Sequence, residues 1–164
     1  MGRKNYLIEG VSGSGKTSVC DELHRRGHHA VHGDRQLAYA GDPATGAPVE
    51  VGGHEYHLWD VAKVRALVFD DRTEATFFCG GSRNYPQFID LFDAVFVLTI
   101  DRGTLMKRLD ARPNGEFGAR PDERALVDRL HASGQDTPEG IAIDATAPLE
   151  RVVDDILRRL THDR

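Results

Sequence analysis

The sequence has few cysteines and no long apolar segment, and each shortage excludes a class of protein. Its 164 residues include only two cysteines, Cys20 and Cys79, which form neither a disulfide framework nor the paired spacing of a zinc site. We expect two reduced, buried thiols in a cytoplasmic protein. No apolar run approaches the roughly 20 residues that cross a bilayer, so we expect no association with a membrane.

The chain also has no surplus of positive charge. Its 21 lysines and arginines stand against 26 acidic residues, which gives a formal charge of −5. Surfaces that bind nucleic acid are usually basic, so a nucleic-acid partner is disfavoured and a kinase of nucleic-acid ends stays a weak alternative. The length suits a single domain over residues 1–164. Monomer and homodimer are both left open.

One sequence motif is complete. Residues 10–17 match the phosphate-loop pattern G-x-x-x-x-G-K-[ST] at every fixed position, and they follow an apolar run at residues 6–8 that is typical of a strand. Glycines in such a loop let backbone amides wrap closely around a phosphate chain. We expect Lys16 to reach the β- and γ-phosphates and the Thr17 hydroxyl to ligate Mg²⁺. The predicted contacts with ATP are Gly10, Ser12, Gly13, Ser14, Gly15, Lys16, Thr17 and Ser18.

Strand and helix patterns alternate along the rest of the chain. Further strands are expected at residues 30–32, 75–79, 94–100 and 141–143. Helical spacing of apolar residues occurs at 17–26, 58–68, 101–109, 122–132 and 148–160, with a shorter stretch at 86–92. This alternation is typical of a parallel sheet with helices on both faces. Ligands bind at the carboxyl ends of such strands, so the residues that follow each strand are the candidates for a site.

An acid and several arginines follow the predicted strands. Asp34 and Arg35 come after the second strand, and Arg83 follows the third. Phosphoryl transfer needs cations on the transferred group and a carboxylate that orients or deprotonates the acceptor. We predict this catalytic role for Asp34, together with a contact to Mg²⁺. A simple turn-forming role for Asp34 and an ion pair of Arg83 with the next helix are the alternatives.

A polar and aromatic cluster ends the long irregular segment at residues 41–54. We predict that His54 and Glu55 contact an acceptor and that Trp59 stacks on a ring of it. Packing of Trp59 in the core is the alternative. His54 and His57 have no third ligand at a suitable spacing, which disfavours a metal site.

In this order the motifs resemble those of small P-loop kinases, namely adenylate kinase, other nucleoside monophosphate kinases and shikimate kinase. The resemblance runs through nearly the whole chain, although only the phosphate loop is highly specific. It implies a three-layer α/β fold with a five-stranded parallel sheet in the order 2-3-1-4-5. It also implies an acceptor-binding region at about residues 35–60 and a short lid at about residues 112–121 that closes over ATP.

Several roles are implied by this resemblance alone. Gly80, Gly81 and Arg83 resemble an acceptor-binding turn. Arg108, Arg112 and Arg120 resemble the arginines of the lid, and Arg120 is the preferred contact of the transferred phosphoryl group, with Arg112 as a second catalytic cation. Thr146, Ala147 and Pro148 resemble the loop that packs against adenine.

The chain departs from the resembled kinases in one position near the metal. Cys79 stands where monophosphate kinases have an aspartate after the third strand. We therefore expect Mg²⁺ to depend on Thr17, water and Asp34.

The sequence favours an ATP- and Mg²⁺-dependent phosphotransferase that acts on a small-molecule acceptor, with a nucleoside or nucleotide preferred. A kinase of a hydroxy acid or sugar, like shikimate kinase, is one alternative. A regulatory ATPase without a small acceptor is another. An apolar run followed by acids at residues 67–71 supports the ATPase, but the run continues a helical spacing that begins at Leu58.

Overall fold

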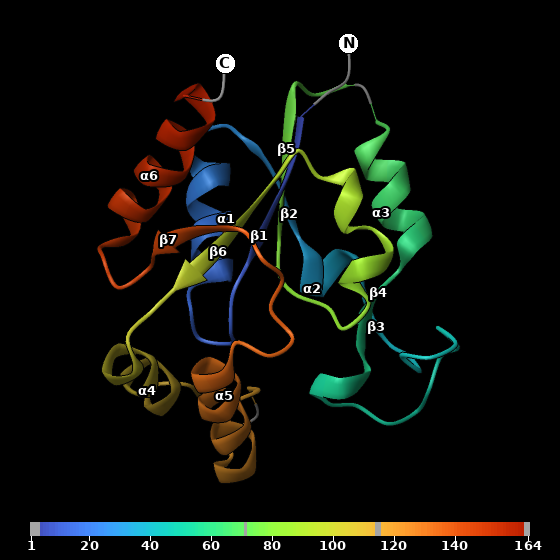
Figure 1. Ribbon diagram of the computed structural model, residues 1–164, viewed down its shortest axis with the longest axis vertical. Coiled ribbons are helices and arrows are strands. Elements are labelled where there is room, and N and C mark those ends of the chain that lie inside the picture. Colours follow the sequence, from blue (N-terminus) through green and yellow to red (C-terminus); the bar gives the residue numbers. More distant parts are fainter. Residues whose placement is uncertain (1–3, 71, 114–115, 163–164) are drawn as a thin grey trace.

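The computed structural model of the chain describes residues 4–70, 72–113 and 116–162. Five parallel strands form its central sheet, in the order β2-β5-β1-β6-β7 (Figure 1). They are β1 (Lys4–Glu9), β2 (His29–His32), β5 (Ala75–Cys79), β6 (Ala94–Thr99) and β7 (Ile141–Asp144). Two further strands belong to a separate hairpin. When these two are left out of the count, the order is the predicted 2-3-1-4-5.

The sheet is covered on both faces, which confirms the three-layer fold. Helices α1 (Lys16–Arg25) and α6 (Leu149–His162) pack on one face. Helix α3 (Val61–Val68) and two short 3-10 turns, η2 (Tyr85–Gln87) and η3 (Ile89–Leu91), cover the other. Because side chains alternate along a strand, Tyr6 and Ile8 of β1 enter the first core while Leu7 enters the second. The two 3-10 turns replace the single short helix expected at residues 86–92.

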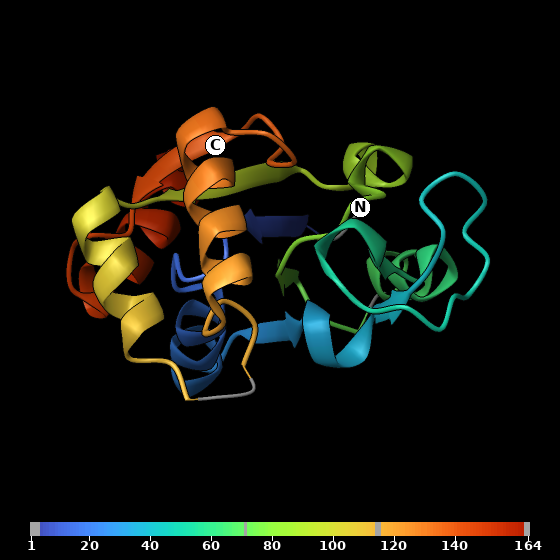
Figure 2. The same cartoon turned by 90° about the horizontal axis from the view of Figure 1, so that it is seen from below.

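Two helices lie beyond the carboxyl ends of the strands. They are α4 (Arg102–Asp110) and α5 (Pro121–Ser133), and they share a small apolar cluster that includes Leu105, Leu109 and Val127. Figure 2 looks at this end of the molecule and shows the two helices on one side and the long loop before His54 on the other. Both flank the strand ends where a ligand was expected. Of the predicted lid at 112–121, residues 114 and 115 lie outside the described residues.

The segment between β2 and α3 differs from the prediction. A short helix, α2 (Gly33–Gln36), leads into an antiparallel pair, β3 (Ala38–Ala40) and β4 (His57–Trp59), with a 3-10 turn, η1 (His54–Tyr56), before β4. The helix expected from Leu58 begins only at Val61, because the Asp60 carboxylate caps it by accepting from the amides of Ala62 and Lys63. This hairpin and the turn before it bring His54 and His57 to the carboxyl ends of the strands.

The expectation of two buried thiols is confirmed. Cys20 on α1 and Cys79 at the end of β5 are both buried, and neither forms a disulfide. They are neighbours in the core between the sheet and α1. A hydrogen bond between the two thiols lowers the pKa of Cys20 and raises that of Cys79. Among the described helices, none is long and apolar enough to cross a membrane.

Candidate active site

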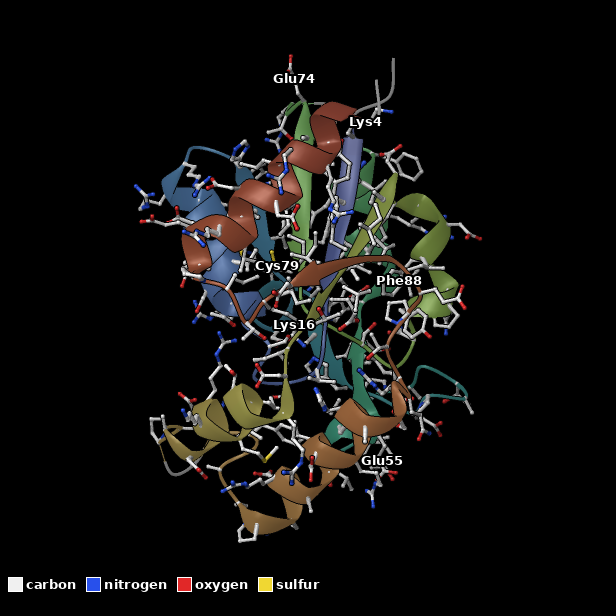
Figure 3. The ribbon with its side chains drawn as sticks, turned by 60° about the vertical axis from the view of Figure 1, so that its left-hand side comes forward. Lys4, Lys16, Glu55, Glu74, Cys79 and Phe88 are labelled. Atoms are coloured by element: carbon white, nitrogen blue, oxygen red, sulfur yellow. The ribbon has the colours of Figure 1, made fainter. Side chains whose placement is uncertain are left out.

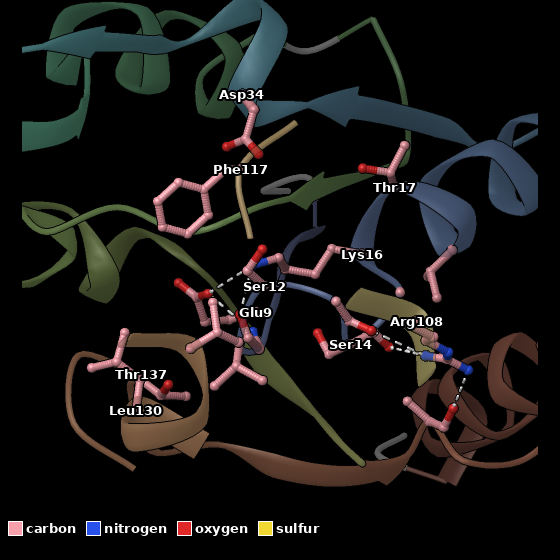
Figure 4. A pocket seen from close by; sticks show the side chains of 18 of the residues that line it. Glu9, Ser12, Ser14, Lys16, Thr17, Asp34, Arg108, Phe117, Leu130 and Thr137 are labelled. Atoms are coloured by element: carbon pink, nitrogen blue, oxygen red, sulfur yellow. Dashed lines mark hydrogen bonds and ion pairs between the residues drawn. The ribbon is translucent and has the colours of Figure 1, made fainter. Parts of the chain in front are cut away.

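A cleft of about 810 Å³ opens at the carboxyl ends of the strands. The phosphate loop forms its floor, α4 and α5 form one wall, and α2 with the β3–β4 hairpin forms the other (Figure 4). The cleft lies at the edge of the sheet where the general rule for parallel sheets places a ligand.

The phosphate loop has the backbone shape that its glycines allow. Gly13 and Gly15 have φ angles of 90° and 107°, in the left-handed region that other residues rarely adopt. A β-carbon at Gly13 would lie 2.8 Å from Cδ1 of Leu105, so this glycine also lets the loop pack against α4. The Lys16 ammonium donates to the Gly10 carbonyl at 2.5 Å. Helix α1 begins at Lys16, so its free N-terminal amides would face a phosphate group bound in the loop.

Asp34 faces this loop across the cleft and is paired with a histidine. Its Oδ1 lies 2.9 Å from Nε2 of His57 on β4. Burial raises the pKa of Asp34, but the hydrogen bond and charge of His57, with the charges of Lys16 and His32, lower it further than burial raises it. The net pKa lies below its ordinary value, so Asp34 is ionised at neutral pH.

Glu9 is a second carboxylate of the cleft, and it was not among the residues predicted for the site. It ends β1 directly before the phosphate loop and is only 2% exposed. Its Oε1 accepts from the Gly10 amide at 3.0 Å and lies 3.8 Å from the Lys16 ammonium. The signal that could have identified it is an acid at the end of an apolar strand, directly before the first glycine of the motif.

Two arginines of α4 and the lid reach the phosphate loop. Arg108 donates to the carbonyls of Gly13 and Ser14 at 3.3 and 3.1 Å. Arg112 donates to Oγ of Ser12 at 2.8 Å and to the carbonyl of Phe117. Arg120 lies elsewhere: its side chain is 71% exposed and faces Asp122. Arg112 therefore reaches the phosphate loop, whereas Arg120 does not contact it.

Three segments meet at the side of the cleft next to the β3–β4 hairpin. Arg83, after β5, donates from Nη1 to Nε2 of His54 at 2.7 Å and lies 3.3 Å from Oδ2 of Asp136. Asp136 also lies 3.0 Å from Nε2 of His54 and has an unusual positive φ of 65°. This cluster joins the loop before β4 to the loop after α5. The sequence placed His54 and Arg83 in the site but not Asp136.

Most of the predicted site residues line the cleft, and six lie outside it. Those that line it are Gly10, Ser12, Gly13, Ser14, Gly15, Lys16, Thr17, Ser18, Asp34, Arg35, His54, Gly81, Arg83, Arg108, Arg112 and Ala147. The six outside are Glu55, Trp59, Gly80, Arg120, Thr146 and Pro148. Phe117 and His57 line it without having been predicted to do so.

Three of the residues outside the cleft have clear structural positions. Trp59 is 1% exposed, and its ring stacks on Phe88 with centroids 5.7 Å apart, so it cannot stack on an acceptor as one of the two interpretations required. Glu55 lies in η1, directly before β4, and its side chain is exposed to solvent (Figure 3). The Thr146 hydroxyl accepts from the amide of Asp101 at 3.2 Å, which ties the loop after β7 to the start of α4.

The oxygen donors that face the cleft fit a magnesium ion. Thr17 offers a hydroxyl from the start of α1, and Asp34 offers an ionised carboxylate from α2 (Figure 4). Mg²⁺ takes oxygen ligands and usually keeps several waters, so two protein ligands are enough. Cys79 contributes no such donor, because it is 4% exposed and packs in the core.

The sheet order, the phosphate loop and the cleft define a P-loop domain of the type found in small-molecule kinases. A family model described as an AAA domain, AAA_18, matches residues 7–129. The chain belongs to this family. No curated protein matches the sequence.

Solved structures of kinases have the same fold. A sugar kinase from a Janibacter species is 18% identical, with a TM-score of 0.61 over 97% of this chain and 95% of that one. A gluconokinase from Sinorhizobium meliloti is 18% identical, with a TM-score of 0.59 over 97% and 92%. A deoxyadenosine kinase from M. mycoides is 16% identical, with a TM-score of 0.53 over 96% and 99%. At these identities the likeness concerns the fold.

Proposed function

We propose that the chain is an ATP- and Mg²⁺-dependent phosphotransferase that transfers the γ-phosphoryl group of ATP to a hydroxyl of a small molecule. The observation that carries the proposal is the placement of Asp34 across the cleft from Lys16 and the phosphate loop. A donor site and an ionised carboxylate thus share one cavity. A regulatory ATPase could use such a carboxylate for Mg²⁺ or for water, so stimulation by a small acceptor is what separates the two functions.

Each residue has a role that follows from its position. Lys16 and the loop amides neutralise the phosphates. Thr17 and Asp34 would hold Mg²⁺, which would shield the charge of the phosphate oxygens. Asp34 orients the acceptor hydroxyl and takes its proton. The acceptor oxygen then bonds to the γ-phosphorus as the bond to the bridging oxygen breaks and ADP leaves.

The arginines Arg108 and Arg112 act on the side of the cleft that binds ATP. Arg112 lies where it can contact the charge that spreads over the transferred group. Arg108 joins the phosphate loop to the carbonyl of Ala145 at 3.1 Å, beside the predicted adenine-binding residue Ala147. Closure of the lid would exclude water, which otherwise accepts the phosphoryl group. We place the protein in the cytoplasm, where ATP and reduced thiols are both found.

Two acceptor classes remain in this proposal. The resemblance to monophosphate kinases favours a nucleoside or nucleotide. A sugar or hydroxy acid is favoured by the cleft itself, because among the described residues that line it Phe117 is the one with a benzene or indole ring. The acceptor side presents carboxylates, imidazoles and Arg83, which suit hydroxyl groups better than a base.

An acceptor screen tests the function directly. Release of ADP from Mg-ATP is measured with nucleosides, nucleoside monophosphates, sugars and hydroxy acids, and phosphorus NMR identifies the product. One class should raise turnover well above background hydrolysis. The variant Lys16→Met should lose this activity, while Lys63→Met, at an exposed position of α3, should keep it. Retained transfer in Lys16→Met, or hydrolysis indifferent to every acceptor, would contradict the proposal.

A further inference from the structure

The carboxyl group of Glu9 is buried between the two halves of the site. Its Oε1 accepts from the Gly10 amide and lies near Lys16. Its Oε2 is buried and has no hydrogen-bond partner among the described residues. A buried, unpartnered oxygen of this kind costs free energy and calls for a functional explanation. The roles proposed above for Lys16 and Asp34 do not use it.

Gly81 leaves the space that this carboxyl group needs. A β-carbon at Gly81 would lie 2.4 Å from Oε1 and 2.8 Å from Oε2 of Glu9. The backbone at Gly81 is not in the left-handed region, so the close approach of Glu9, and not the local turn, requires glycine there. Glu9 therefore contacts the donor loop on one side and the acceptor turn on the other.

Charged groups on α1, on α2 and in the loop after β5 face Glu9. Burial is the largest effect on the pKa of Glu9 and raises it, and the charge of Asp34 on α2 raises it a little further. The charge of Lys16 on α1, the hydrogen bond from the Gly10 amide and the charge of Arg83 lower it. The net pKa of Glu9 is about 7. Arg83 is already paired with Asp136 and His54. The charge of Lys16 is therefore the strongest of the interactions that stabilise the ionised form of Glu9.

We propose that Glu9 is a positioning residue that holds Lys16 in the empty site and takes up a proton when the phosphates of a nucleotide engage that lysine. This inference rests on the proposed function, because it requires a nucleotide in the loop. Phosphate oxygens share the ammonium and bring negative charge toward the carboxylate. A buried carboxylate that loses its counter-charge binds a proton in preference to staying charged. The buffer supplies the proton, which leaves again with the nucleotide.

The pH dependence of nucleotide binding then has a fixed sign. Below about pH 7 Glu9 is protonated before the nucleotide arrives, so binding takes up no further proton there. Above this pH the empty site holds a carboxylate, and binding must draw a proton from solution. The affinity therefore falls as the pH rises, by up to about tenfold per pH unit for one proton. The fall ends once the pH exceeds the raised pKa of the occupied site.

Calorimetry of MgADP binding tests the inference without turnover. Titrations about one pH unit above neutrality, in two buffers with different ionisation enthalpies, give the number of protons taken up. We expect uptake in the wild type and in the control Glu74→Gln, which is exposed at the opposite end of β5 (Figure 3). Glu9→Gln should take up none, and its affinity should not change with pH, whereas that of the wild type should fall by up to about tenfold per unit.

The outcomes separate this inference from the function on which it rests. Equal proton counts in the wild type and Glu9→Gln would overturn the role of Glu9 and leave nucleotide binding intact. A wild type that binds no MgADP would overturn both. If Glu9→Gln does not fold, an infrared difference spectrum of the wild type with and without MgADP decides. A band of a protonated carboxyl group should appear on binding, and its absence would overturn the inference.

Discussion

Nε2 of His57 lies 2.9 Å from Oδ1 of Asp34, so the β3–β4 hairpin directly supports the carboxylate opposite the phosphate loop. The hydrogen bond and charge of His57 act against burial, and they are the largest of the effects that lower the pKa of Asp34. Asp34 must be ionised to take a proton from the acceptor. Activity should therefore be present above the pKa of Asp34 and lost as the pH falls through it.

His57→Ala should move this loss of activity to higher pH. Without the imidazole, less opposes the effect of burial, so the pKa of Asp34 rises. The acid limb of the kcat/KM profile then shifts to higher pH. The exposed His24 on α1 provides the control His24→Ala, whose profile should match that of the wild type. An acid limb that stays in place in His57→Ala would show that Asp34 is not the group that titrates.

Gly81→Ala should destabilise the protein and reduce its activity. The new methyl group would lie 2.4 Å from the buried Glu9 carboxylate, and overpacking of this kind costs about 1–3 kcal/mol in the free energy of unfolding. Urea denaturation gives the difference. Gly52→Ala is the matched control, since a β-carbon there meets nothing within 4 Å. Equal midpoints for the two variants would contradict the close packing of Gly81 on Glu9.

The parts of the site that the sequence predicted are those carried by local patterns. The phosphate loop needs eight consecutive residues, and Asp34 and Arg83 follow recognisable strands. The order of the strands came from the resemblance to known kinases, and the observed sheet has that order. A local sequence pattern was sufficient to predict the loop and these two residues, and a known topology was sufficient to predict the strand order.

The parts that the sequence missed depend on contacts between distant segments. Leu58 fits the helical spacing of α3, but the Asp60 cap and pairing with β3 make it part of a strand. Asp136 joins the site only because the loop after α5 reaches Arg83. A tryptophan in a polar segment is typical of a binding site, and only the packing of Trp59 on Phe88 shows that it belongs to the core. The spacing of residues along the chain carries no information about such long-range contacts.

Trp59 offers a spectroscopic test of its buried position, because it is the single tryptophan of the chain. Acrylamide should quench its fluorescence weakly in the folded protein and strongly in urea, and an acceptor should change the emission little. Trp59→Ala should cost about 3–5 kcal/mol of stability, as expected for a large buried ring. Phe69→Ala, at a side chain 69% exposed, should stay within about 0.5 kcal/mol of the wild type. Strong quenching in the folded state would contradict this packing.

The arginines at 112 and 120 give the sharpest test of how the lid acts. Arg112 already touches Ser12 of the phosphate loop, whereas Arg120 points to solvent beside Asp122. A catalytic arginine on the transferred group is worth roughly 10³ to 10⁵ in kcat. We therefore expect Arg112→Ala to reduce kcat by about 10³ or more and Arg120→Ala by less than about tenfold, with KM for ATP measured alongside. A larger loss in Arg120→Ala would mean that the lid rearranges on closure to bring Arg120 inward, as the sequence first suggested, and that the contact between Arg112 and Ser12 belongs to the empty site alone.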